Sequence, residues 1–534
     1  MAGATSIREE VDRRRTFAII SHPDAGKTTL TEKLLLFGGA IQQAGTVKAR
    51  KSARHATSDW MEVEKQRGIS VTSSVMQFEY AGHVINLLDT PGHEDFSEDT
   101  YRVLTAVDAA VMVIDAAKGV EERTIKLLEI CRLRNTPIIT FINKFDREVR
   151  EPISLIEEVE SVLAIECAPL AWPLGMGKRF HGVFDLRLDR LLRFNAGEER
   201  RSQDEEVIEG LDNSRLEELF PDEIAAMRAD VDLIRGASNP FDVEAFRQGR
   251  QTPVLFGSAI NNFGVQEILQ ALIDWAPSPQ ARAARERLVM PDEPAFTGFV
   301  FKIQANMDPR HRDRIAFLRV CSGRYVPGCR VVHQRTGREM KLAHALSFMA
   351  NERVASETAV AGDIIGLHNH GQLQIGDTLT EGEGLSFRGI PYFAPELFRV
   401  ARARDPFKTK QLAKGLKELG EEGAIQVFEN ALGHTLLGAV GPLQFEIVAH
   451  RLQTEYGVDA IYDSSDTQLA RWLVFPDDAS QKKFEREQAL RLARDVDGNP
   501  VYLANNRYNL QVTIEHWPQV RFLSTREHGE RFEI

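Results

Sequence analysis

The run SHPDAGKT most constrains what this chain can fold into, because it joins an apolar segment to an amphipathic one through a phosphate-binding turn. Residues 16–21 have the pattern of a buried strand, and residues 28–37 that of a helix with its leucines on one face. Backbone N–H groups in such a turn surround a phosphate at the positive end of the helix dipole. The usual pattern opens with glycine, whereas this chain has Ser21. The predicted phosphate loop consists of Ser21, His22, Pro23, Asp24, Ala25, Gly26, Lys27 and Thr28.

Two side chains of this loop have chemistry of their own. Lys27 is expected to reach the β- and γ-phosphates of a nucleotide as a point charge. The Thr28 hydroxyl is a predicted ligand of Mg²⁺.

The second motif, DTPGH, follows an apolar run at residues 81–89. A carboxylate at the carboxyl end of a strand is well placed to hold magnesium through water, which is the role expected of Asp89. Gly92 allows its backbone N–H to approach the γ-phosphate, and His93 is the candidate for orienting the attacking water. We therefore predict nucleotide contacts from Asp89, Thr90, Pro91, Gly92 and His93, and catalysis by His93, Lys27 and Gly92.

Two further motifs indicate that the base is guanine. Apolar runs at 111–115 and 137–143 predict buried strands, and the second delivers NKFD. The Asp146 carboxylate can accept hydrogen bonds from the guanine ring N–H and the exocyclic amine, which adenine cannot supply together. Asn143 and Lys144 are expected to support the base and the phosphate loop. The predicted guanine site comprises Asn143, Lys144, Phe145 and Asp146, with Gly257, Ser258 and Ala259 from LFGSA at 255–259.

A hydroxyl between the first two motifs would complete the magnesium shell when the γ-phosphate is present. Ser70 in QRGIS is the candidate, with Thr72 as its rival. The expected magnesium set is thus Thr28, Ser70 and Asp89, the last through water. The basic segment 48–55 is either a mobile switch that touches RNA phosphates or a solvated loop.

These residues resemble the translational GTPases, which also carry histidine after the DxxG motif. Residues 147–256 separate NKFD from GSA, and elongation factor G and its relatives carry an insertion of this kind. Residues 296–320, 362–380 and 393–399 are similar to the bacterial peptide chain release factor 3 family, and within residues 58–70 Ser70 stands where most relatives have threonine. That resemblance weakens after about residue 465.

The resemblance implies a ribosome-dependent GTPase of translation termination. Such a protein hydrolyses GTP to GDP and phosphate with Mg²⁺, and promotes departure of codon-reading (class I) release factors after peptide release. The implied partners are the ribosome and, functionally, class I release factors, and a monomer is expected. A translocase or tetracycline-protection activity is the close alternative, and a guanine-nucleotide sensor that never hydrolyses is the alternative from another class.

We expect a multidomain chain. An α/β P-loop GTPase domain is predicted at 1–280, with an inserted subdomain at about 151–250 that is either a docking module or a packing appendage. Short alternating segments between turns predict an all-β barrel at 290–387. Strand–helix alternation predicts a C-terminal α/β ferredoxin-like domain at 388–534 with an extension, and residues 524–534 have the composition of a charged tail. Arg310, His311, Arg312 and Arg314 form either an RNA contact or a charged surface hairpin.

Bulk composition restricts the remaining classes. At 534 residues the chain is too long for one core. No apolar run is long enough to span a bilayer, and the N-terminus lacks the pattern of a signal peptide. Four cysteines without a CxxC pair favour reduced thiols in a cytoplasmic protein. The net charge of −12 argues against wholesale coating of nucleic acid, although a local basic face remains compatible with it.

Overall fold

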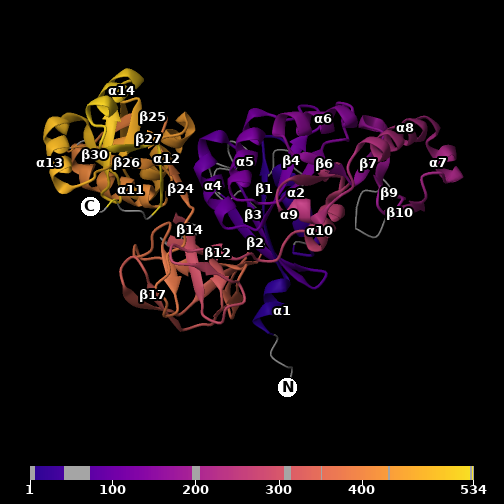
Figure 1. The fold of residues 1–534 in the computed structure, drawn as a ribbon, viewed down its shortest axis with the longest axis horizontal. Helices are drawn as coiled ribbons and strands as arrows, with labels where there is room; N and C mark the ends of the chain where they lie inside the picture. The colour runs from indigo at the N-terminus through magenta and orange to yellow at the C-terminus, as the bar shows by residue number, and fades with distance from the viewer. Residues whose placement is uncertain are drawn as a thin grey trace.

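A computed structural model describes residues 6–40, 73–194, 205–305, 314–349, 352–430, 433, 435–528 and 532. Figure 1 shows an N-terminal domain with an insert at one end, a barrel below it, and a C-terminal domain beside α4 and α5 at the opposite end. Among the described residues, no helix combines the length and the apolar character needed to cross a lipid bilayer.

The N-terminal domain is a mostly parallel sheet in the order β2-β3-β1-β4-β5-β11-β6, in which β2 is antiparallel to β3. Its strands are β1 (Arg14–Ser21), β2 (Ser74–Tyr80), β3 (His83–Asp89), β4 (Ala109–Asp115), β5 (Ile138–Asn143), β6 (Glu166–Pro169) and β11 (Gln251–Phe256). Its helices are α1 (Ile7–Asp12), α2 (Lys27–Phe37), α4 (Ser97–Thr105), α5 (Glu122–Leu133), α6 (Pro152–Leu163), α9 (Val243–Arg247) and α10 (Val265–Asp274), with single 3₁₀ turns η1 (Glu94–Phe96) and η3 (Ala259–Asn261).

The central strands are apolar throughout because helices cover both faces of the sheet. In β1, Phe17 and Ile19 pack in one cluster with Leu30 and Leu34 of α2. The alternating residue Ile20 joins the cluster on the other face. The expected strand at 16–21 and helix at 28–37 are therefore confirmed.

The inserted subdomain begins later in the chain than the expected boundary at about residue 151. Helix α6 and strand β6 belong to the main domain, because β6 pairs in parallel with β11 at the edge of the sheet. The part that stands apart is an antiparallel sheet, in the order β10-β9-β8-β7, together with two helices. It contains β7 (Ala171–Leu174), η2 (Gly177–Arg179), β8 (Gly182–Asp185), β9 (Arg190–Phe194), β10 (Glu205–Glu209), α7 (Ser214–Leu219) and α8 (Pro221–Ala237).

The second domain is an antiparallel β barrel whose strands follow the order β18-β17-β23-β14-β15-β22-β19. A short hairpin, β12 (Arg282–Ala283) with β13 (Leu288–Val289), precedes it. The barrel strands are β14 (Thr297–Ala305), β15 (Arg314–Ser322), β16 (Arg324–Tyr325), β17 (Cys329–His333), β18 (Arg338–Leu342), β19 (Ala345–Met349), β20 (Glu352–Ser356), β21 (Ala359–Val360), β22 (Ile364–His368) and β23 (Thr378–Thr380).

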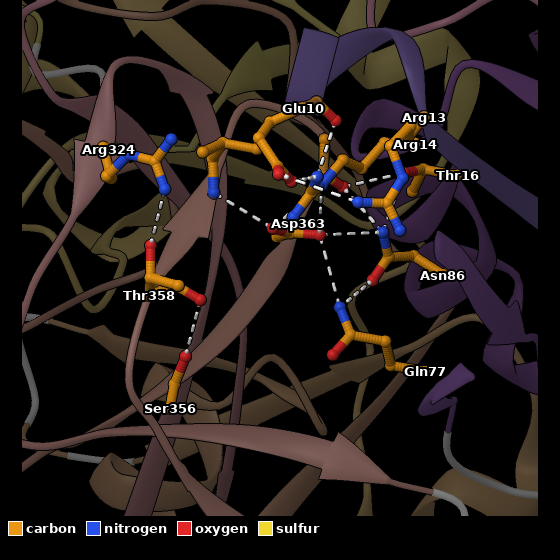
Figure 2. A network of polar contacts seen from close by, with 12 residues as sticks. Glu10, Arg13, Arg14, Thr16, Gln77, Asn86, Arg324, Ser356, Thr358 and Asp363 are labelled. Carbon is orange, nitrogen blue, oxygen red and sulfur yellow. Dashed lines mark hydrogen bonds and ion pairs between the residues drawn. The ribbon is translucent and has the colours of Figure 1, made fainter. Parts of the chain in front are cut away.

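A buried carboxylate lies at the centre of the contacts between the barrel and the N-terminal domain. Asp363 accepts hydrogen bonds from Arg14 of β1 (3.3 Å), Gln77 of β2 (3.2 Å) and Asn86 of β3 (3.2 Å), and Figure 2 shows it at the centre of these side chains. Nearby, Arg319 of β15 forms a buried ion pair with Asp108 at 2.5 Å. Because β19 also pairs with β2, the two domains share one continuous sheet.

The C-terminal domain begins with the pattern expected of a ferredoxin-like sandwich. The chain order β25-α11-β26-β27-α12-β28 gives the antiparallel sheet order β28-β25-β27-β26. Leu412, Leu416 and Leu419 of α11 follow helical spacing and are buried along one stripe. Beyond β26 the same sheet continues as β30-β31-β29-β32.

The elements of this domain are β24 (Pro391–Phe393), β25 (Leu397–Ala403), η4 (Pro406–Lys408), α11 (Thr409–Glu421), β26 (Gln426–Asn430), β27 (Thr435–Ala439), α12 (Pro442–Tyr456), β28 (Ala460–Ser464), β29 (Leu469–Val474), α13 (Asp478–Glu487), η5 (Ala489–Arg491), β30 (Leu492–Arg494), β31 (Pro500–Ala504), α14 (Arg507–His516), β32 (Arg521–Leu523) and β33 (Thr525–Glu527).

The interpretation of residues 524–534 as a charged tail is wrong for its first part. Strand β33 pairs antiparallel with β24, the segment that leads from the barrel into the C-terminal domain. The Arg526 side chain is fully buried, where it lies 4.4 Å from the Tyr392 ring and pairs with Asp495 (3.0 Å) and Asp497 (2.6 Å). Two carboxylates and an aromatic face compensate the buried guanidinium, so a charged sequence forms part of the core.

Candidate nucleotide site

The motif residues lie together because five parallel strands end at one edge of the sheet. Ser21 ends β1, Asp89 ends β3, Asp115 ends β4 and Asn143 ends β5, while Gly257 follows β11. Loops at the carboxyl ends of parallel strands form the usual ligand crevice of such sheets.

The phosphate loop has the backbone shape that an anion site needs. Asp24 (φ 65°) and Gly26 (φ 97°) both adopt left-handed conformations, and Gly26 precedes α2 without a side-chain cap. A Cβ on Gly26 would lie 2.4 Å from Asn143 Nδ2, so only glycine fits there. Along the rest of the loop, Ser21 and Ala25 are buried, Pro23 and Thr28 half-buried and Asp24 exposed, and His22 Nε2 lies 3.2 Å from Glu121.

The predicted phosphate lysine and the predicted magnesium carboxylate form a buried ion pair. Lys27 Nζ contacts Asp89 Oδ1, and their side chains are 5% and 2% exposed. The other carboxylate oxygen, Asp89 Oδ2, is buried and has no hydrogen-bond partner among the described residues. Thr90 Oγ1 donates to the Ile19 carbonyl at 2.7 Å, which ties the start of DTPGH to β1.

The end of DTPGH is more accessible to solvent than its start, because Gly92 and His93 are half-buried whereas Asp89 to Pro91 are buried. A Cβ placed on Gly92 would meet no heavy atom within 4 Å. The His93 side chain is 39% exposed, and its Nδ1 lies 3.3 Å from Asp95 Oδ1. Pro91 is buried, and its carbonyl accepts a hydrogen bond from Arg123 of α5 at 3.0 Å.

Asn143 and Lys144 contact the phosphate loop, as expected. Asn143 Nδ2 donates to the Ala25 carbonyl at 2.9 Å, and its Oδ1 accepts the Ala259 N–H at 2.9 Å. Lys144 donates to the Asp24 carbonyl and pairs with Asp115 at 2.7 Å. Burial acts to raise the pKa of Asp115, but hydrogen bonds from Lys144 and from a backbone N–H hold it below its usual range.

The guanine motifs are connected to each other. Ser258 Oγ donates to Asp146 Oδ1 at 2.7 Å, and the Phe145 N–H donates to the Gly257 carbonyl at 3.1 Å. A Cβ on Gly257 would lie 2.2 Å from the Phe263 carbonyl oxygen, so this turn also requires glycine. The half-buried Asp146 is thereby held in one orientation between the two loops.

The predicted site residues that the structure describes lie on loops at this one edge of the sheet. Ser70 lies outside the described residues, and so do its rival Thr72, segment 48–55 and Arg310 to Arg312. Of the last cluster only Arg314 is described, and it pairs with Glu421 of α11 at 3.1 Å rather than facing solvent. Sequence reasoning missed Asp115, although its position at the end of an apolar strand is the signal that singled out Asp89. It also missed Asp95 and Arg123, whose contacts arise only from tertiary packing.

Known protein families match almost the whole length of the chain. Residues 12–278 match the model of the elongation factor Tu GTP binding domain, residues 295–382 match elongation factor G domain 2, and residues 387–514 match the class II release factor RF3 C-terminal domain. Peptide chain release factor 3 of Aromatoleum aromaticum is 73% identical over 98% of this chain and 96% of its own length. The chain belongs to the peptide chain release factor 3 family.

A solved structure supports the same architecture. A crystal structure of a protein from Thermus thermophilus matches 87% of this chain and 69% of its own chain, with a TM-score of 0.69 and 25% identity. The expected fold class, the assignment as a GTPase and the family-level role in translation termination are confirmed. The roles of individual site residues stay predictions.

Proposed function

We propose that this member of the release factor 3 family hydrolyses GTP on the ribosome after peptide release, and that this drives departure of a class I release factor. The observation that carries the proposal is the convergence of four loops on one edge of the sheet, with the Lys27–Asp89 pair at its centre. Family membership supports the partners, which are the ribosome and class I release factors, and the cytoplasm as the place of action.

In the proposed binding step, nucleotide replaces an internal ion pair. The buried Lys27 ammonium exchanges Asp89 for the β- and γ-phosphates, while N–H groups at the start of α2 donate to the β-phosphate. Since both partners are already desolvated, binding does not have to remove them from water. Asp146 accepts hydrogen bonds from guanine, and Ser258 fixes the orientation of its carboxylate.

The site fits Mg²⁺ through the chemistry of its oxygen donors. Asp89 Oδ2 is a buried carboxylate oxygen without a hydrogen-bond partner among the described residues, and Thr28 offers a hydroxyl at the start of α2. Hard oxygen ligands of this kind suit magnesium, which usually keeps several waters. When bound, Mg²⁺ would neutralise charge that develops on the β- and γ-phosphate oxygens.

Hydrolysis is proposed to depend on the DTPGH loop. The Gly92 N–H donates to the γ-phosphate, and the partly exposed His93 side chain orients the attacking water. No arginine of the four motifs is an evident finger. We therefore expect slow turnover until the ribosome orders the site.

A single experiment tests the proposal against its alternatives. GTP turnover is measured with and without ribosomes, and release of a labelled class I release factor from post-hydrolysis ribosomes is followed in parallel. We expect ribosomes to stimulate turnover and GTP to accelerate release. Binding of GTP without turnover would identify a sensor, and ribosome-stimulated turnover without release of the factor would favour a translocase.

A further inference from the structure

The loop that carries His93 is built into the C-terminal domain. Asp95, two residues beyond His93, is 7% exposed, and its Oδ2 accepts the backbone N–H of Leu443 at 2.6 Å. Leu443 lies in the first turn of α12, a helix of 15 residues. The first N–H groups of a helix lack partners within it and carry the positive end of its dipole. A carboxylate from the N-terminal domain therefore caps a helix of the C-terminal domain.

The same carboxylate also contacts the catalytic candidate. Asp95 Oδ1 lies 3.3 Å from His93 Nδ1, and the Asp95 backbone N–H lies 3.3 Å from the same nitrogen. A protonated Nδ1 donates to the carboxylate, whereas an unprotonated Nδ1 accepts the backbone N–H. In both cases Nδ1 is engaged within the protein, and Nε2 is the nitrogen left for a water molecule.

The approach of α12 to this loop is close and specific. A Cβ on Gly441, the residue before α12, would lie 2.0 Å from Asp95 Oδ1, so the carboxylate occupies the space that a side chain at this position would need. Phe96 packs against Leu443 and Ile447 of α12 in one buried cluster. Glu98, the second residue of α4, accepts a hydrogen bond from Gln426 of β26 at 2.8 Å. Asp95, Phe96 and Glu98 thus all contact the C-terminal domain within five residues of His93.

We propose that Asp95 is a positioning residue that holds the His93 ring for water activation, and that α12 in turn holds Asp95. Hydrolysis then depends on the seating of the C-terminal domain against the His93 loop. This inference deepens the proposed function and rests on it, because it takes His93 as the residue that orients water. A partner that lifts α12 from Asp95 would slow hydrolysis without touching the nucleotide.

A double-mutant cycle tests whether Asp95 acts through His93. Asp95→Ala is introduced into the wild-type and the His93→Ala chains, and single-turnover GTP hydrolysis is measured on ribosomes. We expect Asp95→Ala to slow the wild type about 10-fold, to leave GTP affinity within about 2-fold, and to have almost no effect when His93 is already alanine. Asp95→Asn, which keeps an acceptor for the Leu443 N–H, should lose less. An equal loss in both backgrounds, or none in the wild type, would overturn the proposal.

A second variant disturbs the contact between Asp95 and α12 by a change in the C-terminal domain. Gly441→Ala changes only the C-terminal domain, and its Cβ would displace either the Asp95 carboxylate or α12, so it should slow hydrolysis about as much as Asp95→Ala with GTP affinity unchanged. Gly236→Ala in α8, where a Cβ meets nothing within 4 Å, is the matched control. A wild-type rate for Gly441→Ala would refute coupling to the C-terminal domain. If ribosomes failed to stimulate the wild-type chain itself, the proposed function would fail instead.

Discussion

Substitution of Asp146 by asparagine tests base recognition most sharply. Ser258 Oγ donates to Asp146 Oδ1, so in the variant the amide oxygen should face Ser258 and the NH₂ group should take the place of Oδ2. That NH₂ group would oppose a guanine donor, and the charge that strengthens the remaining hydrogen bond is lost. Hydrogen bonds to charged groups contribute roughly 1.5–3 kcal/mol each, so we expect GTP affinity to fall by about 3–4 kcal/mol, roughly 150- to 900-fold.

Xanthosine triphosphate should show the reverse preference, because a carbonyl oxygen replaces the exocyclic amine of guanine and accepts from the new NH₂ group. Calorimetric titration of both nucleotides measures the switch. Asp274→Asn at the exposed end of α10 controls for loss of one negative charge. Ser258→Ala should weaken GTP only about 5-fold, with no gain for the xanthine nucleotide, because it removes the bond that orients the Asp146 carboxylate but neither of the bonds from that carboxylate to guanine. A variant at position 146 that still prefers GTP would refute the assignment of Asp146.

Four further outcomes are expected. His93→Ala should leave GTP binding intact but slow ribosome-stimulated hydrolysis ~10²-fold or more, as single-turnover measurements would show. Lys27→Ala should abolish tight binding of GDP and GTP and also lower the melting temperature of the free protein, because it leaves the buried Asp89 carboxylate without its cation. Ser70→Ala should weaken GTP more than GDP in calorimetry; equal losses would point to Thr72. Asp99 of α4 has a pKa of about 2, against an ordinary 3.8, because its burial, which acts to raise the pKa, is outweighed by Lys302, Arg102 and Ser73. Ionised Asp99 therefore adds about 2 kcal/mol to the free energy of unfolding above pH ~4, and this stabilisation is lost as pH falls toward 2. Asp99→Asn should make the free energy of unfolding depend less on pH in that range.

The nucleotide site could be predicted from sequence because its parts follow from local rules. A buried strand, a turn and a helix place Gly26, Lys27 and Thr28 with little help from the rest of the chain. The carboxyl ends of parallel strands necessarily share an edge, so Asp89 and Asn143 had to lie near them. The same rule would have added Asp115.

Contacts between domains could not be predicted in this way. Nothing in the spacing of residues 89–105 indicates that Asp95 meets Leu443, which lies far along the chain. Strand β33 was mistaken for a tail because its three residues are polar and charged, and Arg526 is buried only through partners supplied by Tyr392, Asp495 and Asp497. The hydrophobic pattern of a sequence does not reveal that a charged residue is buried beside groups that compensate its charge.

The carboxylate of Asp363 has a mechanical consequence. Any rotation of the barrel against the nucleotide-binding sheet would part Asp363 from Arg14 and Arg319 from Asp108, which would leave buried charges unpaired at a cost of about 3–5 kcal/mol each. The bonds that reach from Asp95 and Glu98 to the C-terminal domain pair a carboxylate with a backbone amide or a side-chain amide, and they release no orphaned cation when they break. The barrel and the sheet should therefore move as one stiff arm. Motion of the last domain against this arm would have to part Arg314 of the barrel from Glu421 of α11, an ion pair that is partly exposed and therefore costs less to break than the fully buried pairs.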